Sequence, residues 1–132
     1  MFAAYGDRIH FVYREYPLPN HQYARMAAEA GQCANEQGKF WPYHDRLFAN
    51  QQHLTVPELK EHAAALGLDT ARFNACVDAH KYASVIDKDI AIGNDAGVTG
   101  TPAFYINGRM ISGAQPFEAF KKIIDEELAR GR

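Results

Sequence analysis

The sequence is poor in cysteine, has no long apolar run and carries no excess of charge of one sign. Its 132 residues include two cysteines, Cys33 and Cys76, which are too far apart to form a Cys-x-x-Cys motif. Lysine and arginine number 14 against 16 aspartates and glutamates, so the formal net charge is −2. No basic face is present to neutralise a run of phosphates, which excludes a nucleic acid as an expected partner.

The missing apolar run excludes a second kind of partner. A helix that crosses a bilayer needs ~20 predominantly apolar residues, and no uncharged run in this chain approaches that length. The first residues also lack the basic-then-apolar pattern of a signal peptide. We therefore expect no membrane partner.

The composition is that of an ordinary globular protein. Hydrophobic residues make up 47% of the chain and charged residues 23%, with 10 glycines and 6 prolines. This mixture is unlike that of disordered or collagen-like chains. Because domains typically contain ~100–200 residues, the sequence predicts a single domain over residues 1–132.

The first two thirds of the chain contain one predicted strand and a block of predicted helices. Apolar and polar side chains alternate over Ile9–Glu15, in a run rich in β-branched and aromatic residues, which predicts a strand. About five helical stretches follow as far as Gly97, including a capping box at Thr55 and Glu58 and an N-cap at Asp69. The side chains predicted on the inward stripes of the first two helices are Tyr23, Met26, Ala27, Ala30, Cys33, Ala34, Phe40, Tyr43, Leu47 and Phe48. The later helices are predicted to run through Leu59, Ala63, Leu66, Phe73, Cys76, Val77, Tyr82, Val85, Ile86 and Ile90, with Cys76 on an inward stripe.

The last third of the chain contains a predicted β-hairpin and a final helix. Ala103–Ile106 and Arg109–Ser112 flank the pair Asn107-Gly108, which readily adopts the positive φ angles of a two-residue turn. Pro116 then begins a helix whose buried side is predicted to hold Phe117, Phe120, Ile123, Ile124 and Leu128. The element order predicts a small α/β domain with a helical insertion at about residues 20–97.

The beginning of the chain has an unusual pattern. Met1–Tyr5 followed by Gly6 is typical of the last turn of a helix and its C-terminal glycine. Five residues do not form a stable helix alone, since isolated helices below ~12–15 residues are marginal. The pattern predicts that the chain begins inside a helix.

Several stretches resemble one known family. Val98–Gly108, which includes Gly100-Thr101-Pro102, resembles the loop and hairpin of the DsbA-like thiol-disulfide oxidoreductases of the thioredoxin superfamily. Phe11–Pro19, Glu36–Trp41 and His44–Phe48 also resemble stretches of that family, in the family's order. The resemblance implies an incomplete thioredoxin-like fold of the α/β class, with a DsbA-type helical insertion, a C-terminal β-hairpin and a helix.

The chain departs from the family's pattern at the redox site. Family members carry Cys-x-x-Cys at the start of a helix, where the helix N-terminus lowers the pKa of a thiol. Aligning Ile9–Glu15 with the family's second strand implies an N-terminal truncation that removes the first strand and this motif. The removed strand would leave backbone groups unpaired within the sheet. We therefore expect a homodimer or another strand-completing partner, or pairing of Ile9–Glu15 with Ala103–Ile106.

The resemblance also identifies candidate substrate-binding residues. It implies a cis peptide bond between Thr101 and Pro102, and a loop that holds a peptide or protein substrate. For Cys33 and Cys76 two interpretations remain: buried free thiols that pack as small apolar groups, or a structural disulfide like the non-catalytic pair of some relatives. No catalytic residue is expected among the 132 present.

The histidines and aromatic residues give weaker indications of a functional site. His10, His21, His44, His53, His62 and His80 lack metal-ligand spacing, so no metal site is expected and surface or capping roles are predicted. His44 and Asp45 are adjacent on a helix and are expected to point in different directions, which argues against an acid–base pair. The aromatic residues Phe40, Trp41, Tyr43 and Phe48 fit either a peptide groove or core packing.

The function implied by the resemblance is dithiol-disulfide exchange in a full-length form, without a cofactor. We expect this chain alone to be inactive, because it lacks the redox pair. The alternatives are a non-catalytic peptide-binding or dimerising module, or a relative of the glutathione-using isomerases that share the fold. The family is mostly extracytoplasmic, but the sequence of this chain does not identify its compartment.

Overall fold

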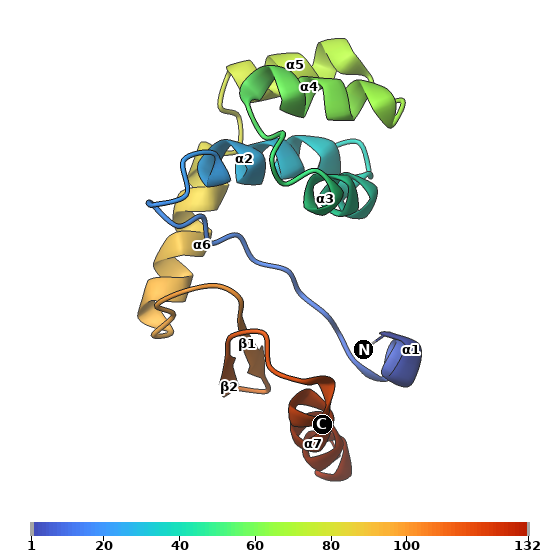
Figure 1. Cartoon of the computed structure of the whole chain (residues 1–132). Helices are drawn as coiled ribbons and strands as arrows, with labels where there is room; N and C mark the ends of the chain where they lie inside the picture. The colour runs from blue at the N-terminus through green and yellow to red at the C-terminus, as the bar shows by residue number, and fades with distance from the viewer. Residues whose placement is uncertain (1, 132) are drawn as a thin grey trace. The chain divides into compact units, whose positions relative to one another are not determined.

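Helices form most of the chain, and a single β-hairpin lies near its end (Figure 1). The computed structural model describes residues 2–131, with side chains from residue 4 onward. The elements in chain order are α1 (Phe2–Tyr5), the short 3₁₀ helix η1 (Gly6–Arg8), α2 (Ala24–Asn35), α3 (Phe40–Ala49), α4 (Val56–Ala65), α5 (Thr70–Asp78), α6 (Ala83–Asp95), β1 (Ala103–Ile106), β2 (Arg109–Ser112) and α7 (Phe117–Ala129).

The chain separates into two compact units. The terminal unit comprises Met1–Arg14 and Asn94–Arg132, and the helical unit comprises Glu15–Gly93. The helical unit contains α2 to α5 and most of α6, which are the elements of the predicted helical insertion. The α/β class and the insertion are therefore confirmed, while the prediction of a single domain over residues 1–132 stays a prediction.

The core of the helical unit is built around a disulfide. Cys33 of α2 and Cys76 of α5 are bonded to each other and are 1% and 5% exposed. Of the two interpretations of these cysteines, the structure therefore shows the disulfide. The buried apolar residues packed in the same cluster are Ala30, Ala34, Tyr43, Leu59, Ala63, Leu68, Phe73 and Val77.

Specific hydrogen bonds position the helices of this unit. The hydroxyl of Tyr43 donates to the Leu59 carbonyl at 2.8 Å, which joins α3 to α4, and burial raises the pKa of this tyrosine. The capping box at Thr55 and Glu58 begins α4, and the Asp69 carboxylate accepts from the Arg72 amide at the start of α5. Both predicted caps are confirmed.

Glu36 connects the end of α2 to two other segments. Its carboxylate accepts from Lys81, from the Tyr82 hydroxyl at 2.6 Å and from Arg72 at 3.0 Å. The hydrogen bonds from Lys81 and Tyr82 stabilise the carboxylate and lower the pKa of Glu36 to about 2. The ionised form of Glu36 therefore holds α2, α5 and the start of α6 together near neutral pH.

Two acidic residues are buried together in the same unit. The backbone amide of Glu15 donates to the Asp89 carboxylate at 3.0 Å, and the Gln32 amide donates to the Glu15 carboxylate at 3.3 Å. Burial is the main reason that the pKa of Glu15 rises to about 7, and the nearby Asp89 charge adds to it. This contact fastens the segment before α2 to α6.

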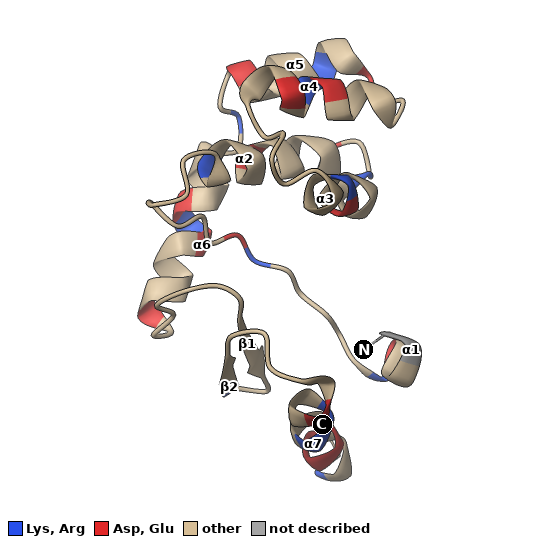
Figure 2. Cartoon of the chain, viewed as in Figure 1, with Lys and Arg blue, Asp and Glu red and all other residues tan. Residues whose placement is uncertain are grey.

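The terminal unit packs the hairpin against α7. Phe104 of β1 meets Phe120 of α7 edge to face, with 4.8 Å between ring centroids. The Tyr5 hydroxyl donates to the Asp125 carboxylate at 2.7 Å, which fastens the end of α1 to α7. Asp125 also accepts from Lys121 at 2.6 Å, and Figure 2 shows acidic and basic residues side by side on α7.

The predicted hairpin is confirmed at its predicted bounds. Ile106 is paired with Arg109 and Ala103 with Ser112 in the antiparallel register. The turn residues Asn107 and Gly108 have φ angles of 48° and 85°, as a two-residue turn requires. Three positions predicted to face inward on helices are instead exposed, because each lies at or next to a helix end; they are Tyr23, Phe48 and Phe117.

The predicted strand over Ile9–Glu15 is wrong for this chain. The segment runs extended from η1 toward α2, but the sheet of the described residues consists of β1 and β2. The expected pairing of this segment with Ala103–Ile106 within one chain is therefore wrong as well. A strand requires a neighbour for its hydrogen bonds, and alternation in the sequence does not supply one. The predicted helix end is present as α1, although Met1 lies outside the described residues.

Removal of the disulfide is expected to destabilise the helical unit. In the chain-entropy model, a bond that closes a loop of about 44 residues contributes ~4 kcal/mol. Urea unfolding of the Cys33→Ala, Cys76→Ala double variant should show a lower midpoint than wild type. Treatment of wild type with dithiothreitol should produce a similar shift. Two reactive thiols in the denatured, non-reduced protein would contradict the bridge.

Lowering the pH is expected to increase the contribution of Glu15 to the stability of the folded protein. Folding raises the pKa of Glu15 from 4.5 to about 7. The contribution of Glu15 to the free energy of unfolding is therefore fully present below pH 4.5 and is lost as the pH rises through 7. Glu15→Gln should therefore raise stability at pH 8, by an amount on the order of 3 kcal/mol, and flatten the pH dependence. Urea unfolding at pH 5 and pH 8 measures this, with exposed Glu61→Gln as the matched control. Equal pH profiles for wild type and Glu15→Gln would exclude the effect.

Candidate functional site

The candidate site is the loop between α6 and β1. Gly97, with a φ angle of 84°, follows the end of α6, and the chain then reaches the exposed pair Thr101 and Pro102. The peptide bond between Thr101 and Pro102 is cis. A Cβ atom placed on Gly100 would meet no other atom within 4 Å, so this position of the loop is open.

The hydrogen bonding of the Thr101 backbone differs from that of its neighbour. Among residues 2–131, no group forms a hydrogen bond with its amide or its carbonyl. The next residue is different, because the Pro102 carbonyl accepts from the Gly113 amide at 2.8 Å. The hairpin ladder thus holds Pro102 in place and leaves a donor and an acceptor of Thr101 available to a ligand.

A tyrosine of the hairpin fastens the other end of the loop. The Tyr105 hydroxyl donates to the Ala96 carbonyl and lies 3.5 Å from the Met110 sulfur. The hairpin is held to α7 by Arg109, whose guanidinium donates to Glu126 at 2.8 Å and to Glu127 at 3.2 Å. The hydrogen bonds that the guanidinium donates to these two carboxylates raise the pKa of Arg109. Tyr105 is not among the site residues predicted from the sequence, although alternation along a short strand places it on the exposed face of β1.

Neither cysteine provides a thiol for redox chemistry. Cys33 and Cys76 are bonded to each other and buried in the helical unit. The structure therefore gives them a structural role, and they contribute no nucleophile. Thr101 and Pro102 lie next to each other in an accessible loop, so the substrate-binding role assigned to them stays a prediction with a suitable geometry.

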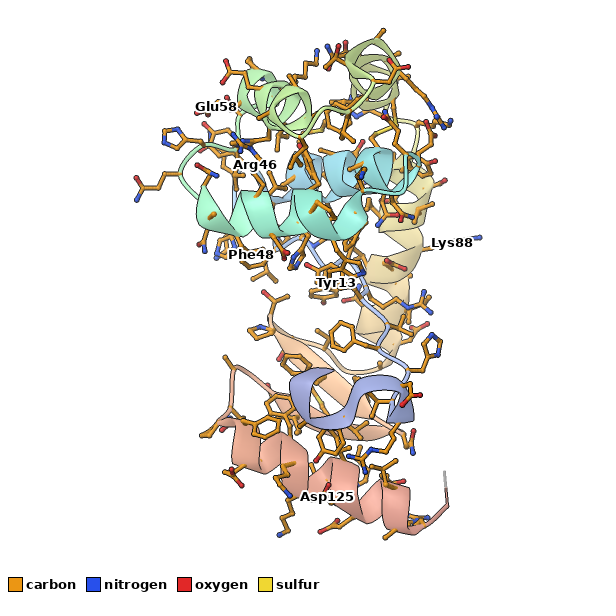
Figure 3. All side chains as sticks on the ribbon, turned by 90° about the vertical axis from the view of Figure 1, so that its right-hand side faces the viewer. Tyr13, Arg46, Phe48, Glu58, Lys88 and Asp125 are labelled. Atoms are coloured by element: carbon orange, nitrogen blue, oxygen red, sulfur yellow. A yellow bond between two sulfur atoms is a disulfide. The ribbon has the colours of Figure 1, made fainter. Side chains whose placement is uncertain are left out.

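The histidines make local contacts. His44 Nδ1 lies 3.1 Å from the Asp45 carboxylate, so the expectation that these neighbours point apart is wrong. The His44 ring also lies against Phe48, with 4.6 Å between centroids, and Figure 3 shows Phe48 pointing away from α4. Tyr43 is fully buried, whereas Trp41 and Phe48 are 44% and 58% exposed, so core packing explains only part of the aromatic cluster.

His62 differs from the prediction of a surface or capping role, because it is buried. Arg46 Nε donates to its Nδ1 at 3.0 Å, and its Nε2 lies 2.8 Å from the His53 carbonyl. Since Nδ1 accepts, the proton is assigned to Nε2, which donates to that carbonyl. Both ring nitrogens are therefore used in joining α3, the following loop and α4.

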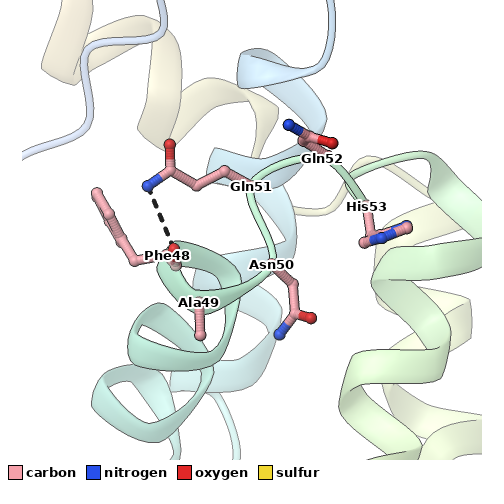
Figure 4. A pocket seen from close by; sticks show the side chains of 6 residues that line it. All are labelled: Phe48, Ala49, Asn50, Gln51, Gln52 and His53. Atoms are coloured by element: carbon pink, nitrogen blue, oxygen red, sulfur yellow. Dashed lines mark hydrogen bonds between the residues drawn. The ribbon is translucent and has the colours of Figure 1, made fainter.

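An open pocket of about 510 Å³ lies at the end of α3 (Figure 4). Its lining residues are Phe48, Ala49, Asn50, Gln51, Gln52 and His53. The Gln51 side chain donates to the Phe48 carbonyl at 3.2 Å, and the Asn50 side chain donates to the Arg46 carbonyl at 2.9 Å. These amides serve the helix end, and His53 Nδ1 lies 2.7 Å from the Glu58 carboxylate.

The described part of the chain contains neither a metal-binding cluster nor a helix that could span a membrane. Residues 2–131 contain no cluster of three or more His, Cys, Asp or Glu side chains that could hold a metal ion. In the same residues, no helix combines the length and the apolar character needed to cross a membrane.

The chain is similar to part of several antiporters. The Na(+)/H(+) antiporter NhaA 3 of Salinispora tropica is 38% identical over 125 residues, which cover 94% of this chain and 19% of the antiporter. NhaA of Herminiimonas arsenicoxydans is 37% identical over 112 residues, covering 85% of this chain and 18% of that protein. The chain thus spans about a fifth of the length of the curated relatives it matches.

A solved structure and a family pattern give the fold and the family. A thioredoxin-like oxidoreductase from Silicibacter pomeroyi superposes with a TM-score of 0.72 at 24% identity, over 92% of this chain and 68% of that one. This likeness shows a thioredoxin-like fold. The family described as thioredoxin matches residues 2–126. The chain therefore belongs to the thioredoxin family.

Proposed function

We propose that the chain is a DsbA-like thiol-disulfide oxidoreductase domain whose Thr101–Pro102 loop holds an extended polypeptide substrate. In a full-length form that has a Cys-x-x-Cys pair, the bound substrate would undergo dithiol-disulfide exchange. The 132 residues alone would bind the substrate without turning it over. The family membership supports the reaction class, and the loop supports the binding role.

The backbone of Thr101 is the observation that carries this proposal. Its amide and carbonyl have no hydrogen-bond partner among residues 2–131, and only Pro102 separates Thr101 from β1. An extended polypeptide can satisfy both groups through main-chain hydrogen bonds, as in strand addition. Binding of this kind depends little on the substrate's side chains, which suits an enzyme that acts on many proteins.

The chemistry also explains why we expect the chain alone to be inactive. In exchange, a thiolate attacks one sulfur of a substrate disulfide, a mixed disulfide forms and the other substrate sulfur leaves as a thiolate. A second thiol then attacks the mixed disulfide and releases the reduced substrate. Cys33 and Cys76 cannot perform these steps, because each is already bonded to the other and buried. Cation exchange is not proposed, since the match covers about a fifth of the antiporters.

A peptide titration followed by NMR tests the binding role. An extended peptide should shift the Thr101 amide signal and slow its hydrogen exchange, because that amide gains an acceptor. Gly100→Val places a side chain in the space beside the loop and should weaken binding about tenfold, or ~1.4 kcal/mol. Exposed Ala114→Val is the matched control and should bind normally. An unchanged Thr101 amide at saturating peptide would refute the binding role.

A reduction assay with insulin tests the chemical role. The chain should not accelerate insulin reduction by dithiothreitol beyond the rate without protein, because it has no accessible thiol pair. The Cys33→Ala, Cys76→Ala double variant is the control. Turnover by wild type that persists in this variant would show a chemistry other than the one proposed.

A further inference from the structure

We propose that Met110 is an oxidation site, and that its sulfoxide releases the loop between α6 and β1 from the hairpin. A peroxide is the oxidant, and the Tyr105 hydroxyl is the group that changes its hydrogen-bond partner. The release concerns the contact at Ala96 and is separate from substrate binding. Its effect on an extended polypeptide at Thr101 rests on the proposed function.

Met110 has the most exposed sulfur-containing side chain among residues 2–131. Thiolates and thioethers are the side-chain groups that oxidants convert step by step at sulfur. Cys33 and Cys76 are bonded to each other, so neither offers a thiolate. Met26 is half-buried against the core of the helical unit, whereas Met110 is 42% exposed. Met110 is therefore the sulfur that a peroxide in solution reaches most readily.

The Tyr105 hydroxyl contacts both the loop and the sulfur of Met110. Tyr105 and Met110 are cross-strand partners in the antiparallel register, which places their side chains on the same face of the hairpin. Both side chains are exposed there. The hydroxyl donates to the Ala96 carbonyl at the start of the loop and lies 3.5 Å from the Met110 sulfur. The contact thus joins the loop to an oxidisable residue.

The oxidation state of Met110 changes which acceptor the hydroxyl prefers. The Tyr105 hydroxyl has one proton and a thioether is a weak acceptor, so in the reduced protein the proton goes to the Ala96 carbonyl. A sulfoxide carries a polar oxygen on the same sulfur. That oxygen lies on the opposite strand of the same hairpin, so bonding to it orders no loop. Because Ala96 is exposed, water can hydrate its carbonyl once the hydroxyl has left.

The oxidation step needs hydrogen peroxide and no further reactant. The Met110 sulfur donates an electron pair to one peroxide oxygen, so an S–O bond forms and the O–O bond breaks. The sulfur is oxidised by two electrons. The other oxygen is reduced, takes the proton of the transferred oxygen and leaves as water. Methionine sulfoxide reductases reverse the step, so the release of the loop is reversible.

Peroxide treatment followed by mass spectrometry and ¹⁵N relaxation tests the inference. In the native protein, Met110 should gain one oxygen roughly tenfold faster than Met26, because susceptibility follows exposure. The order parameters of the Gly97 and Gly100 amides should then fall from about 0.85 toward ~0.6. Reductases for both sulfoxide epimers should restore them. Equal oxidation rates of the two methionines, or an unchanged loop after complete oxidation of Met110, would overturn the proposal.

Three variants assign the effect to the two side chains. Met110→Leu has a similar volume but no sulfur, so peroxide should leave its loop unchanged. Tyr105→Phe lacks the hydroxyl, so its loop should be mobile before oxidation and peroxide should add nothing. Met26→Leu is the matched control and should respond as wild type does. A loop that still responds to peroxide in Tyr105→Phe would contradict the change of hydrogen-bond partner.

Peptide binding is measured separately in the same samples. Oxidation of wild type should weaken the binding of an extended peptide about threefold, because a mobile loop must be ordered again on binding. If reduced wild type binds no peptide, the proposed function fails, while the relaxation measurements still test the release of the loop. If oxidation mobilises the loop and peptide binding is unchanged, the effect of Met110 on the substrate site is wrong.

Discussion

The two-residue turn at Asn107 and Gly108 determines which backbone groups of the hairpin form hydrogen bonds between β1 and β2 and which face outward. Positive φ angles at these two positions bring Ile106 opposite Arg109, and the alternation of hydrogen bonds then follows along both strands. One set of groups joins β1 to β2, and it extends to Pro102 and Gly113. The other set, which includes Ala103 and Tyr105, faces outward. The substrate-binding proposal uses backbone groups of Thr101, which have no hydrogen-bond partner among residues 2–131.

The helical unit is stabilised by a small number of strong connections between helices. A disulfide joins α2 to α5, the Tyr43 hydroxyl joins α3 to α4, and the Glu36 carboxylate joins α2 to α5 and to the start of α6. The buried pair Glu15 and Asp89 acts in the opposite direction and lowers the stability of this unit, because removing carboxylates from water is costly. Protonation of Glu15 near neutral pH reduces that cost, as its raised pKa indicates.

The parts of the structure that depend on local chemistry could be predicted from the sequence. The hairpin, the capping box at Thr55 and the Asp69 cap each depend on residues close together in the chain, and all three are confirmed. The strand over Ile9–Glu15 could not be predicted reliably, because its existence depends on a distant neighbour. For the same reason the cysteines remained ambiguous: pairing requires α2 and α5 to pack together. The cis bond at Thr101 came only from the family resemblance, since local sequence favours the trans form.

The covalent bond between Cys33 and Cys76 makes residues 33–76 a closed ring that contains α3 and α4. A protease that cuts the exposed Gln51–His53 segment would open this ring without releasing a fragment, because the two pieces would still be joined through sulfur. Only subsequent reduction would separate them. The oxidation state of this one bond thus decides whether a nicked molecule stays a single covalent entity.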